Sequence, residues 1–510
     1  MAPPNLVGRL AARRRVAREH DRYAEFMKHV EPGLAARPRV HRFAAPPVLG
    51  EPGTPAEPVA VCIDATAPGD PSAATRASLE RQTVAPASVI EAPLTDALDR
   101  TRAPWLLALA PGDRLTAHAL ERLGQAATLA PDAALLTFDD DVLDPAGRRL
   151  APRLRPGPSP DLMLARDVTG GSLCVRRERV TAGTAAGHAL AVALARPDGA
   201  GHAHVPLILR HRAWREDPED DAGHLPMRRT TNAEPEVEVI VCFRDRAQLL
   251  RRCVHSLLGV TAYERLRVRL LDNASADQAT AGVVRELAAD RRVTVTRDDR
   301  PFNFSALNNA AAHASDADVL VFLNNDTEVI EPDWISALLE EALRPEVGAV
   351  GPLLVHADGS VQHAGAAVGV HGFAGHPFAG LAPGAQTPFG SALDGTRNWL
   401  AVTAACLTIE RWKFGAVGGF DETFTVAGND VDLGLRLTAA GQRSLCVPHT
   451  RLVHDGSASR DPAHPPAGDE QRSRERYGDF LRIGDPFYHP ALTVSRTDCS
   501  LRGAREAGTA

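Results

Sequence analysis

The sequence predicts an α/β protein made of two doubly wound sheets in tandem, of which the second is complete. From residue 237 onward, short apolar segments alternate with amphipathic ones, which is typical of a parallel sheet covered by helices. The first half repeats this plan more loosely, and polar text at 214–235 separates the halves like a linker. We predict a basic helical extension (1–50), a degenerate domain (51–215), a linker (216–235), a complete domain (236–460) and a C-terminal tail (461–510).

The complete domain is predicted element by element from its hydrophobic periodicity. Continuous apolar runs indicate buried strands, and apolar residues at helical spacing indicate helices. A later helix is predicted to begin near Asn429 and to end at Gly441. The predicted strands are 237–243, 266–272, 292–296 and 318–323, and the helices between them are 246–258, 277–289 and 305–314.

The first half is predicted to contain the same elements in the same order. A strand at 58–64 and a helix at 72–84 open it, and the apolar segment 104–113 parallels 318–326. The segment 119–138 likewise parallels 334–354. We therefore interpret the chain as an internal duplication of one α/β unit.

Composition excludes several classes of protein. At 44% hydrophobic residues the 510-residue chain is globular, and a net charge of −7 does not indicate a nucleic-acid binder. No apolar run reaches the ~20 residues that cross a bilayer, and no signal-peptide pattern opens the chain, so we expect a cytoplasmic protein. Residues 1–45 hold ten basic and four acidic residues. This segment favours a solvated helix on its own domain, and peripheral contact with an anionic membrane is the alternative.

Polar residues stand where predicted strands end or helices begin in the second half: Asp272-Asn273, Asn324-Asn325-Asp326, Asn429-Asp430 with Asp432, and His454. Each has a simpler explanation when taken alone, as a turn residue, a helix-terminal acid or a half-buried histidine. In a doubly wound sheet, however, ligands bind beyond the carboxyl ends of the strands. One carboxylate and one imidazole suit Mn²⁺ or Mg²⁺ bound to a diphosphate, so the combination favours a metal site that includes Asp326.

Longer motifs identify a family. Residues 236–460 resemble the family 2 glycosyltransferases of the GT-A fold, in the bacterial branch associated with O-antigen and other surface polysaccharides. The resemblance rests on "VEVIVCFRDRAQLLRRCVHSLL", "LLDNASAD", "PFNFSALNNAA", "VFLNNDTEVIEPDWI", "TAACLTIERWKFGAVGGFDETFTVAGNDVDLGLRL" and "HDGSASR". It implies inverting, metal-dependent transfer of a sugar from a nucleotide-diphosphate sugar to a hydroxyl of a glycan or lipid-linked glycan, with Mn²⁺ or Mg²⁺ as cofactor.

The resemblance also implies a role for each matching residue. Cys242 and Phe243 depart from it, because many relatives have Pro-Thr at these positions. The implied roles are nucleotide binding for Arg244, Asp245, Asp272 and Asn324, metal or diphosphate binding for Asp326 and His454, and general-base catalysis for Asp430.

The first half resembles the same family more distantly. The place of the metal motif reads Ala110-Pro111-Gly112-Asp113, and the late helix opens with His188 and Ala189 instead of a carboxylate. We therefore expect a domain that does not transfer sugar and is kept for packing, acceptor binding or partner assembly. The triplet Asp139–Asp141 is interpreted as an acidic turn in preference to a metal site.

Other functional classes fit less well. A catalytically inactive scaffold that binds nucleotide sugars or glycans is the main alternative. A nucleotidyltransferase is disfavoured because no glycine-rich phosphate loop follows the strand 237–243, and a dehydrogenase lacks its GxGxxG motif.

Overall fold

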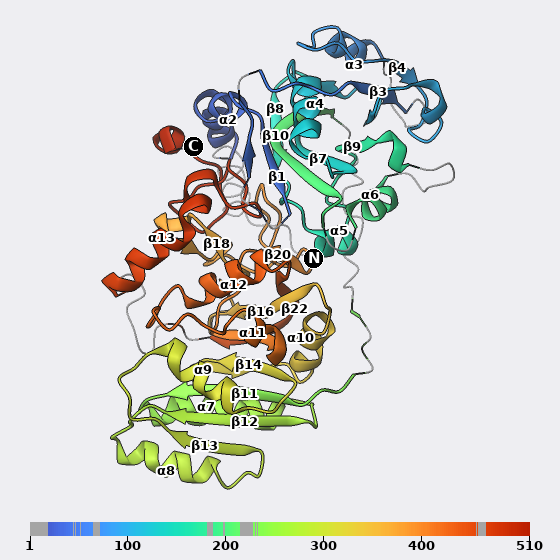
Figure 1. Ribbon diagram of the computed structural model, residues 1–510. Helices are drawn as coiled ribbons and strands as arrows, with labels where there is room; N and C mark the ends of the chain where they lie inside the picture. Colours follow the sequence, from blue (N-terminus) through green and yellow to red (C-terminus); the bar gives the residue numbers. More distant parts are fainter. Residues whose placement is uncertain are drawn as a thin grey trace, which may run out of the picture.

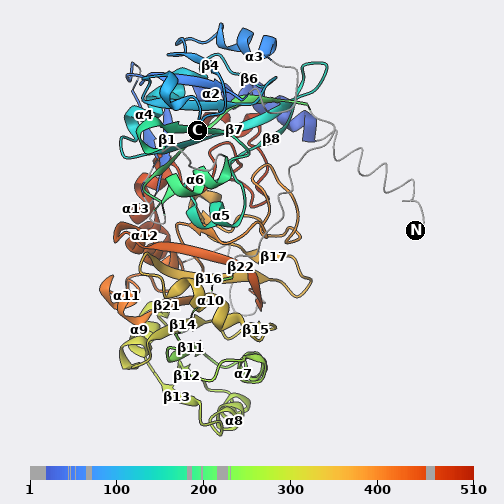
Figure 2. The same ribbon diagram turned by 90° about the vertical axis from the view of Figure 1, so that its right-hand side faces the viewer.

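The computed structural model shows two lobes, each built around one sheet (Figure 1). It describes residues 19–509 apart from 44, 46, 52, 65–71, 181–186, 197–198, 215–227, 230, 232, 455 and 457–465. The first lobe lies at the top of Figure 1 and the second at the bottom, and the C-terminal segment (red) lies where they meet in both views (Figures 1 and 2).

The sheet of the second lobe has the order β13-β12-β11-β14-β21-β16-β22-β15. Its first four strands are parallel, whereas β21 runs antiparallel between β14 and β16, so the sheet is mixed. The four predicted strands are confirmed to within one residue at each end. The strands are β11 (Val237–Phe243), β12 (Leu266–Asp272), β13 (Val293–Arg297), β14 (Val319–Leu323), β15 (Thr327–Val329), β16 (Val347–Val355), β17 (Val361–His363), β20 (Arg397–Trp399), β21 (Cys406–Glu410) and β22 (Arg443–His454).

Side-chain hydrogen bonds set where two helices of the second lobe begin. Asp277 and Asn303 act as N-caps, accepting hydrogen bonds from the N–H groups of Ala279 and Ala306. All five residues of β14 are buried, as expected for a strand covered on both faces. The helices are α7 (Ala247–Val260), α8 (Gln278–Leu287), α9 (Phe304–Ala314), α10 (Trp334–Ala342), α11 (Arg411–Ala416) and α12 (Asn429–Ala439).

The sheet of the first lobe has the order β2-β1-β10-β7-β9-β5-β3-β4. Its strands are β1 (Arg39–Arg42), β2 (Val48–Leu49), β3 (Val59–Ile63), β4 (Val89–Glu91), β5 (Trp105–Leu109), β6 (Arg114–Leu115), β7 (Leu135–Leu143), β8 (Arg149–Arg153), β9 (Leu173–Arg176) and β10 (His202–Ala213). The helices are α2 (Glu31–Ala35), α3 (Ser72–Leu79), α4 (Ala119–Leu129), α5 (Pro160–Ala165) and α6 (His188–Ala195).

The two sheets share one topology, which confirms the predicted duplication. Strands β4-β3-β5-β9-β7-β10 follow the same order, and pair in the same parallel or antiparallel sense, as β12-β11-β14-β21-β16-β22. Even the short strands correspond, because β6 and β8 pair with β10 and β7 as β15 and β17 pair with β22 and β16. The exact domain boundaries stay a prediction.

The interpretation of Asp139–Asp141 as an acidic turn is wrong. These residues lie within β7, and each is 0% exposed. Cationic and imidazole side chains from distant segments neutralise them, so the local sequence gave no sign of their burial. The partners are His204 and His489 for Asp139, Arg155, Arg210 and Arg212 for Asp140, and Arg149 and His211 for Asp141.

The terminal segments lie on the lobes. Residues 19–29 are helical and bury Tyr23 and Phe26 in the core of the first lobe, while residues 1–18 are outside the described part. Helix α13 (Ala467–Ile483) lies along the second lobe and leads into the C-terminal segment. Within the described residues, none of the helices combines the length and hydropathy that a membrane span requires.

Candidate active site

Strand β14 ends in a tight turn made of Asn324, Asn325 and Asp326. Thr327 closes this turn, since its backbone N–H and its hydroxyl both donate to the Asn324 carbonyl, at 3.3 and 2.7 Å. The Asn324 N–H donates to the carbonyl of Ala405 at 3.0 Å. The turn is therefore fixed on both sides, and it presents Asp326 from a rigid backbone.

His454 reaches this turn through the pairing of β15 with β22, which places Thr327 opposite His454. The His454 Nε2 lies 3.2 Å from Oδ1 of Asp326 and 3.3 Å from Nδ2 of Asn324. Burial raises the pKa of Asp326, but the hydrogen bond and the charge of His454 outweigh it, so the net pKa lies below the usual value. The predicted metal pair is thus brought together.

Asp430 lies beside the same turn, in the first turn of α12. Its Oδ2 accepts a hydrogen bond from the Ala404 N–H at 3.2 Å, and the neighbouring Ala405 is the residue that holds Asn324. Segment 404–405 therefore links the two predicted sites. The Asp430 side chain is half-buried, so one side of the carboxylate remains open to an acceptor.

A glycine sets the start of α12. Gly428 has φ of +84°, and a Cβ at this position would lie 2.7 Å from Oγ of Ser473 and 2.8 Å from the hydroxyl of Tyr477. Both side chains belong to α13, and the Tyr477 hydroxyl donates to the Gly428 carbonyl at 3.2 Å. Helix α13 thus supports the backbone from which Asp430 projects.

The sequence analysis missed two histidines of the site, His363 and His376. His376 donates from Nδ1 to the Gln362 carbonyl at 3.1 Å, and its ring centroid lies 4.6 Å from that of His363. Burial lowers the pKa of His376, and the Asp430 carboxylate opposes this shift. The Nε2 of His363 accepts a hydrogen bond from the Thr403 N–H at 3.2 Å, and the neighbouring Ala404 N–H holds Asp430. The only sequence signal was a histidine in each of two glycine-containing segments, "VQHAG" and "AGHPFAG".

Asp432 and Asp421 serve the structure around the site. Asp432 is 0% exposed and lies 2.8 Å from guanidinium nitrogens of both Arg436 and Arg476. Asp421 accepts a hydrogen bond from Arg476 at 2.8 Å. These contacts tie α12 to α13 and leave Asp430 as the acid of its helix that faces the site.

The residues predicted for nucleotide binding lie at the carboxyl ends of β11 and β12. Asp272 is opposite Phe243 in the parallel pair, and its Oδ2 lies 3.1 Å from Nη1 of Arg297. Asp245 accepts hydrogen bonds from two backbone N–H groups of the loop after β12, at 2.8 and 2.9 Å, and these bonds lower its pKa. Arg244 is exposed beside them.

All the predicted residues therefore share one edge of the sheet. Strand β11 pairs in parallel with β12 on one side and with β14 on the other, so Asp272, Arg244 and Asp326 follow the carboxyl ends of three adjacent strands. His454 and Asp430 join this edge from β22 and α12. The structure places Arg244, Asp245, Asp272, Asn324, Asp326, Asp430 and His454 along this edge, whereas Asp432 pairs with Arg436 and Arg476 instead. The individual roles stay predictions.

The donor set at Asp326 fits a divalent cation. A carboxylate oxygen and an imidazole nitrogen 3.2 Å apart are ligands that Mn²⁺ takes readily. The Nδ1 of His454 is buried and has no hydrogen-bond partner among the described residues, so the protein there does not fix which ring nitrogen carries the proton. Asp326 and His454 would hold the cation.

A second group with metal-ligand chemistry lies in the first lobe, away from this edge. Ligand atoms of Asp139, His204 and His489 lie within 4.8 Å of one another. However, Nδ1 of His489 accepts a hydrogen bond from the Ala491 N–H at 3.1 Å, so a neutral His489 carries its proton on Nε2 and donates it to Asp139. This proton occupies the position that a cation would need, so we interpret the group as a hydrogen-bonded contact.

The equivalent edge of the first lobe is filled by the protein itself. Asp113 precedes β6 as Asp326 precedes β15, and His211 is opposite Arg114 as His454 is opposite Thr327. The guanidinium of Arg210 lies 3.5 Å from Asp113 and 2.8 Å from Asp140. A side-chain cation therefore lies beside Asp113, the counterpart of Asp326. The equivalence of His211 with His454 was not visible in the sequence.

Comparison with known proteins assigns a family to part of the second lobe. Residues 238–369 match the model of the family described as "Glycosyl transferase family 2". The chain contains a family 2 glycosyltransferase domain, and this domain includes Arg244, Asp245, Asp272, Asn324 and Asp326.

Two relatives have names that refer to polysaccharide biosynthesis or sugar transfer. The chain is 40% identical over 438 residues to the O-antigen biosynthesis protein RfbC of Myxococcus xanthus, covering 78% of this chain and 34% of the relative. It is 38% identical over 144 residues to an N-acetylglucosaminyl-diphospho-decaprenol L-rhamnosyltransferase of Mycobacterium tuberculosis, covering 26% of this chain and 46% of the relative. The chain thus spans about a third to a half of these relatives' length. A solved structure of GalNAc-T7 with UDP, GalNAc and Mn²⁺ overlaps at a TM-score of 0.39, with 17% identity over 48% of each chain, which is too partial to support an argument.

Proposed function

We propose that the second lobe transfers a sugar, with inversion, from a nucleotide-diphosphate sugar to a hydroxyl of a glycan or lipid-linked glycan of a surface polysaccharide. The observation that carries the proposal is the convergence of Asp326, His454 and Asp430 on one sheet edge inside a family 2 domain. The family relatives named for O-antigen biosynthesis and rhamnosyl transfer support the choice of acceptor class.

The residues of the site have separable tasks. Asp430 accepts the proton of the acceptor hydroxyl, a general-base contribution of ~10²–10⁴-fold. Its Oδ2 is held by the Ala404 N–H and its Oδ1 by the Val431 N–H, so the carboxylate is oriented before the acceptor arrives. Asp326 and His454 would bind Mn²⁺ or Mg²⁺, which when bound neutralises charge on the leaving diphosphate. Arg244, Asp245 and Asp272 are proposed to contact the nucleotide.

Binding measurements test the metal and nucleotide assignments. Calorimetry with UDP, GDP and dTDP, each with Mn²⁺ or Mg²⁺, is expected to give metal-dependent binding that Asp326→Ala abolishes. Asp316→Ala, a change to an exposed carboxylate paired with Arg267, is the control and should bind normally. Equal binding by Asp326→Ala would contradict the assignment.

Turnover measurements test the catalytic assignment. Asp430→Asn keeps the size of the side chain and its contact with Ala404, so nucleotide binding should persist while transfer falls by at least ~10²-fold. dTDP-L-rhamnose is included among the donors because one relative is named as a rhamnosyltransferase. Transfer at the normal rate by this variant would show that another residue is the base. Binding of donors with no transfer to any acceptor would favour the scaffold alternative.

The first lobe is proposed not to transfer sugar, because Arg210 occupies the position equivalent to the metal and α6 offers no carboxylate. Asp113→Ala should therefore leave transfer unchanged. The reaction is proposed to occur in the cytoplasm, at the inner face of the membrane when the acceptor is lipid-linked. Peripheral membrane contact, if tested with anionic vesicles, should depend on residues 1–18, since Tyr23 and Phe26 are buried in the first lobe.

A further inference from the structure

The C-terminal segment 485–502 connects the first lobe to the candidate active site; we call it the tail strap. On the side of the first lobe, the Nε2 of His489 donates to Oδ2 of Asp139 at 2.7 Å. Nearby, Nδ1 of His41 donates to the Pro486 carbonyl at 3.1 Å. Gly157 allows this approach, since a Cβ there would lie 1.8 Å from the Pro486 oxygen. The strap is therefore docked on the first lobe at specific points.

On the other side, the strap holds residues 368–381, which we call the His376 loop. The carbonyls of Val494 and Thr497 accept hydrogen bonds from the backbone N–H groups of His371 and Phe378, both at 2.7 Å. The Oδ2 of Asp485 accepts a third bond from the Val368 N–H at 2.8 Å. Three backbone groups of the loop thus depend on the strap.

The loop in turn faces the proposed base. His376 lies between the His371 and Phe378 attachments, and its ring centroid lies 4.6 Å from that of His363. The Nε2 of His363 accepts a hydrogen bond from the Thr403 N–H at 3.2 Å, and the next residue, Ala404, donates its N–H to Asp430. By contrast, the contact between Asp326 and His454 depends on the pairing of β15 with β22 and involves no residue of the strap. The strap therefore reaches the site through the His376 loop, whereas the Asp326–His454 contact is held by the sheet itself.

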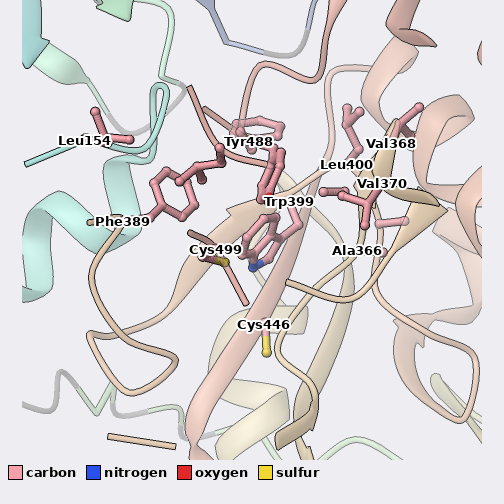
Figure 3. Close-up of a cluster of buried hydrophobic side chains, with 14 of the residues drawn as sticks. Leu154, Ala366, Val368, Val370, Phe389, Trp399, Leu400, Cys446, Tyr488 and Cys499 are labelled. Atoms are coloured by element: carbon pink, nitrogen blue, oxygen red, sulfur yellow. The ribbon is translucent and has the colours of Figure 1, made fainter. Parts of the chain in front are cut away.

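A shared apolar cluster makes this connection rigid. Figure 3 shows Leu154 of the first lobe, Phe389 and Trp399 of the second lobe, and Tyr488 and Cys499 of the strap in one buried group. The Phe389 ring lies 6.5 Å from Trp399 and 5.9 Å from Tyr488, measured between centroids. A close-packed cluster of this kind transmits displacement instead of absorbing it.

The Asp139–His489 contact is the polar anchor of the strap. Asp139 is 0% exposed and His489 is 3% exposed. The second carboxylate oxygen of Asp139 accepts from the Arg155 N–H at 2.7 Å, and Nδ1 of His489 accepts from the Ala491 N–H, so neither side chain can rotate without losing a buried bond. The anchor therefore fixes both partners in one orientation.

We propose that Asp139 and His489 are positioning residues for the transfer reaction, through which the first lobe fixes the tail strap and, by way of the strap, the His376 loop in front of Asp430. The effect on catalysis rests on the proposed function of the second lobe. The anchoring of the strap and of the His376 loop does not. It assigns the inactive lobe a task in the reaction: it anchors the segment that completes the acceptor side.

Hydrogen exchange measured by mass spectrometry tests the structural part without any substrate. In His489→Ala, exchange in peptides that cover 368–381 should accelerate at least tenfold, while peptides covering 319–329 stay unchanged. His489→Gln places an N–H near the position of the imidazole Nε2 and should restore most of the protection. His255→Ala, which removes an exposed histidine paired with Glu286 at 2.8 Å, is the matched control and should leave both regions unchanged.

Kinetics test the catalytic part. Release of nucleoside diphosphate from the donor identified by the binding screen should fall at least tenfold in kcat for His489→Ala, with recovery in His489→Gln. The Kd of UDP or dTDP with Mn²⁺ should stay within twofold of the wild type. A role in stability alone would lower binding and turnover together and would not produce this split.

Unchanged exchange at 368–381 in folded His489→Ala overturns the anchor. Should that variant fail to fold, Asp139→Asn is decisive, because it keeps the side-chain volume and weakens the same contact; normal exchange at 368–381 in this variant also overturns the inference. If the wild type transfers no sugar, the proposed function fails while the exchange result still decides the anchor. Accelerated exchange with unchanged kcat would refute the catalytic consequence.

Discussion

Gly428→Ala should displace the proposed base while sparing the metal side of the site. At φ of +84° an alanine costs about 1–2 kcal/mol in backbone strain. The new Cβ would lie 2.7 Å from Ser473 and 2.8 Å from the 1%-exposed Tyr477, and such overpacking costs about 1–3 kcal/mol. The sum of about 2–5 kcal/mol corresponds to a lowering of Tm of roughly 6–15 °C for a lobe of this size. Since the strain is relieved by shifting α12, kcat should fall ~10²-fold.

Differential scanning fluorimetry measures the change in Tm, and donor turnover measures the change in kcat. Calorimetry of nucleotide binding with Mn²⁺ should show unchanged affinity. Gly415→Ala is the matched control, because that glycine lies in α11 with nothing within 4 Å of an added Cβ. The double variant Gly428→Ala/Tyr477→Phe should regain part of the activity, since it removes one of the two clashing oxygens. Wild-type Tm and kcat in Gly428→Ala would refute the link between the glycine and the placement of Asp430.

Two further predictions concern buried charges. Burial raises the pKa of Asp485 from 3.8 to about 7, so the unfolded chain releases this proton at a lower pH than the folded chain does. The stability that is present below pH ~4 is therefore lost as the pH rises to ~7, by up to about 4 kcal/mol. Asn has no proton to release, so the wild type should lose stability relative to Asp485→Asn as the pH rises across this range. A constant difference in unfolding midpoint would contradict the assignment. Lys413 is 0% exposed, donates its three N–H groups to backbone carbonyls at 2.7–2.8 Å and forms an ion pair with Glu410. Lys413→Met should therefore lower the free energy of unfolding by about 3–5 kcal/mol in denaturant titrations. Trp412→Ala removes a 58%-exposed ring whose centroid lies 5.6 Å from Nζ of Lys413, and it should lower the free energy of unfolding by only about 0.5–1 kcal/mol.

Hydrophobic periodicity was sufficient to predict the strands and helices that surround the site. Strands β11 and β12 match their predicted bounds because apolar runs end abruptly at polar residues there. The antiparallel direction of β21 could not be predicted, since an apolar run carries no information about strand direction. The burial of Asp139–Asp141 was missed for a related reason: the side chains that neutralise the triplet come from β8, from Arg155 just after it, from β10 and from the tail strap.

The candidate site could be predicted where a residue lies at or just beyond the carboxyl end of a strand. Asp272 is the last residue of β12 and Asp326 lies in the turn after β14, and the pairing of the strands places both on one edge. His363 and His376 were not recognised, because the fold alone brings them to Asp430. The equivalence of His211 with His454 required the register of β6 with β10, which no local pattern reveals.

Because the guanidinium of Arg210 lies beside Asp113, the two lobes should differ in how they respond to the removal of metal ions. In the first lobe the positive charge belongs to a side chain and is always present, whereas the cation proposed for Asp326 and His454 would come from solution. Under the proposed function, removal of the metal with EDTA should lower the stability of the second lobe and leave that of the first lobe unchanged. The first lobe would then serve as an internal control for metal dependence.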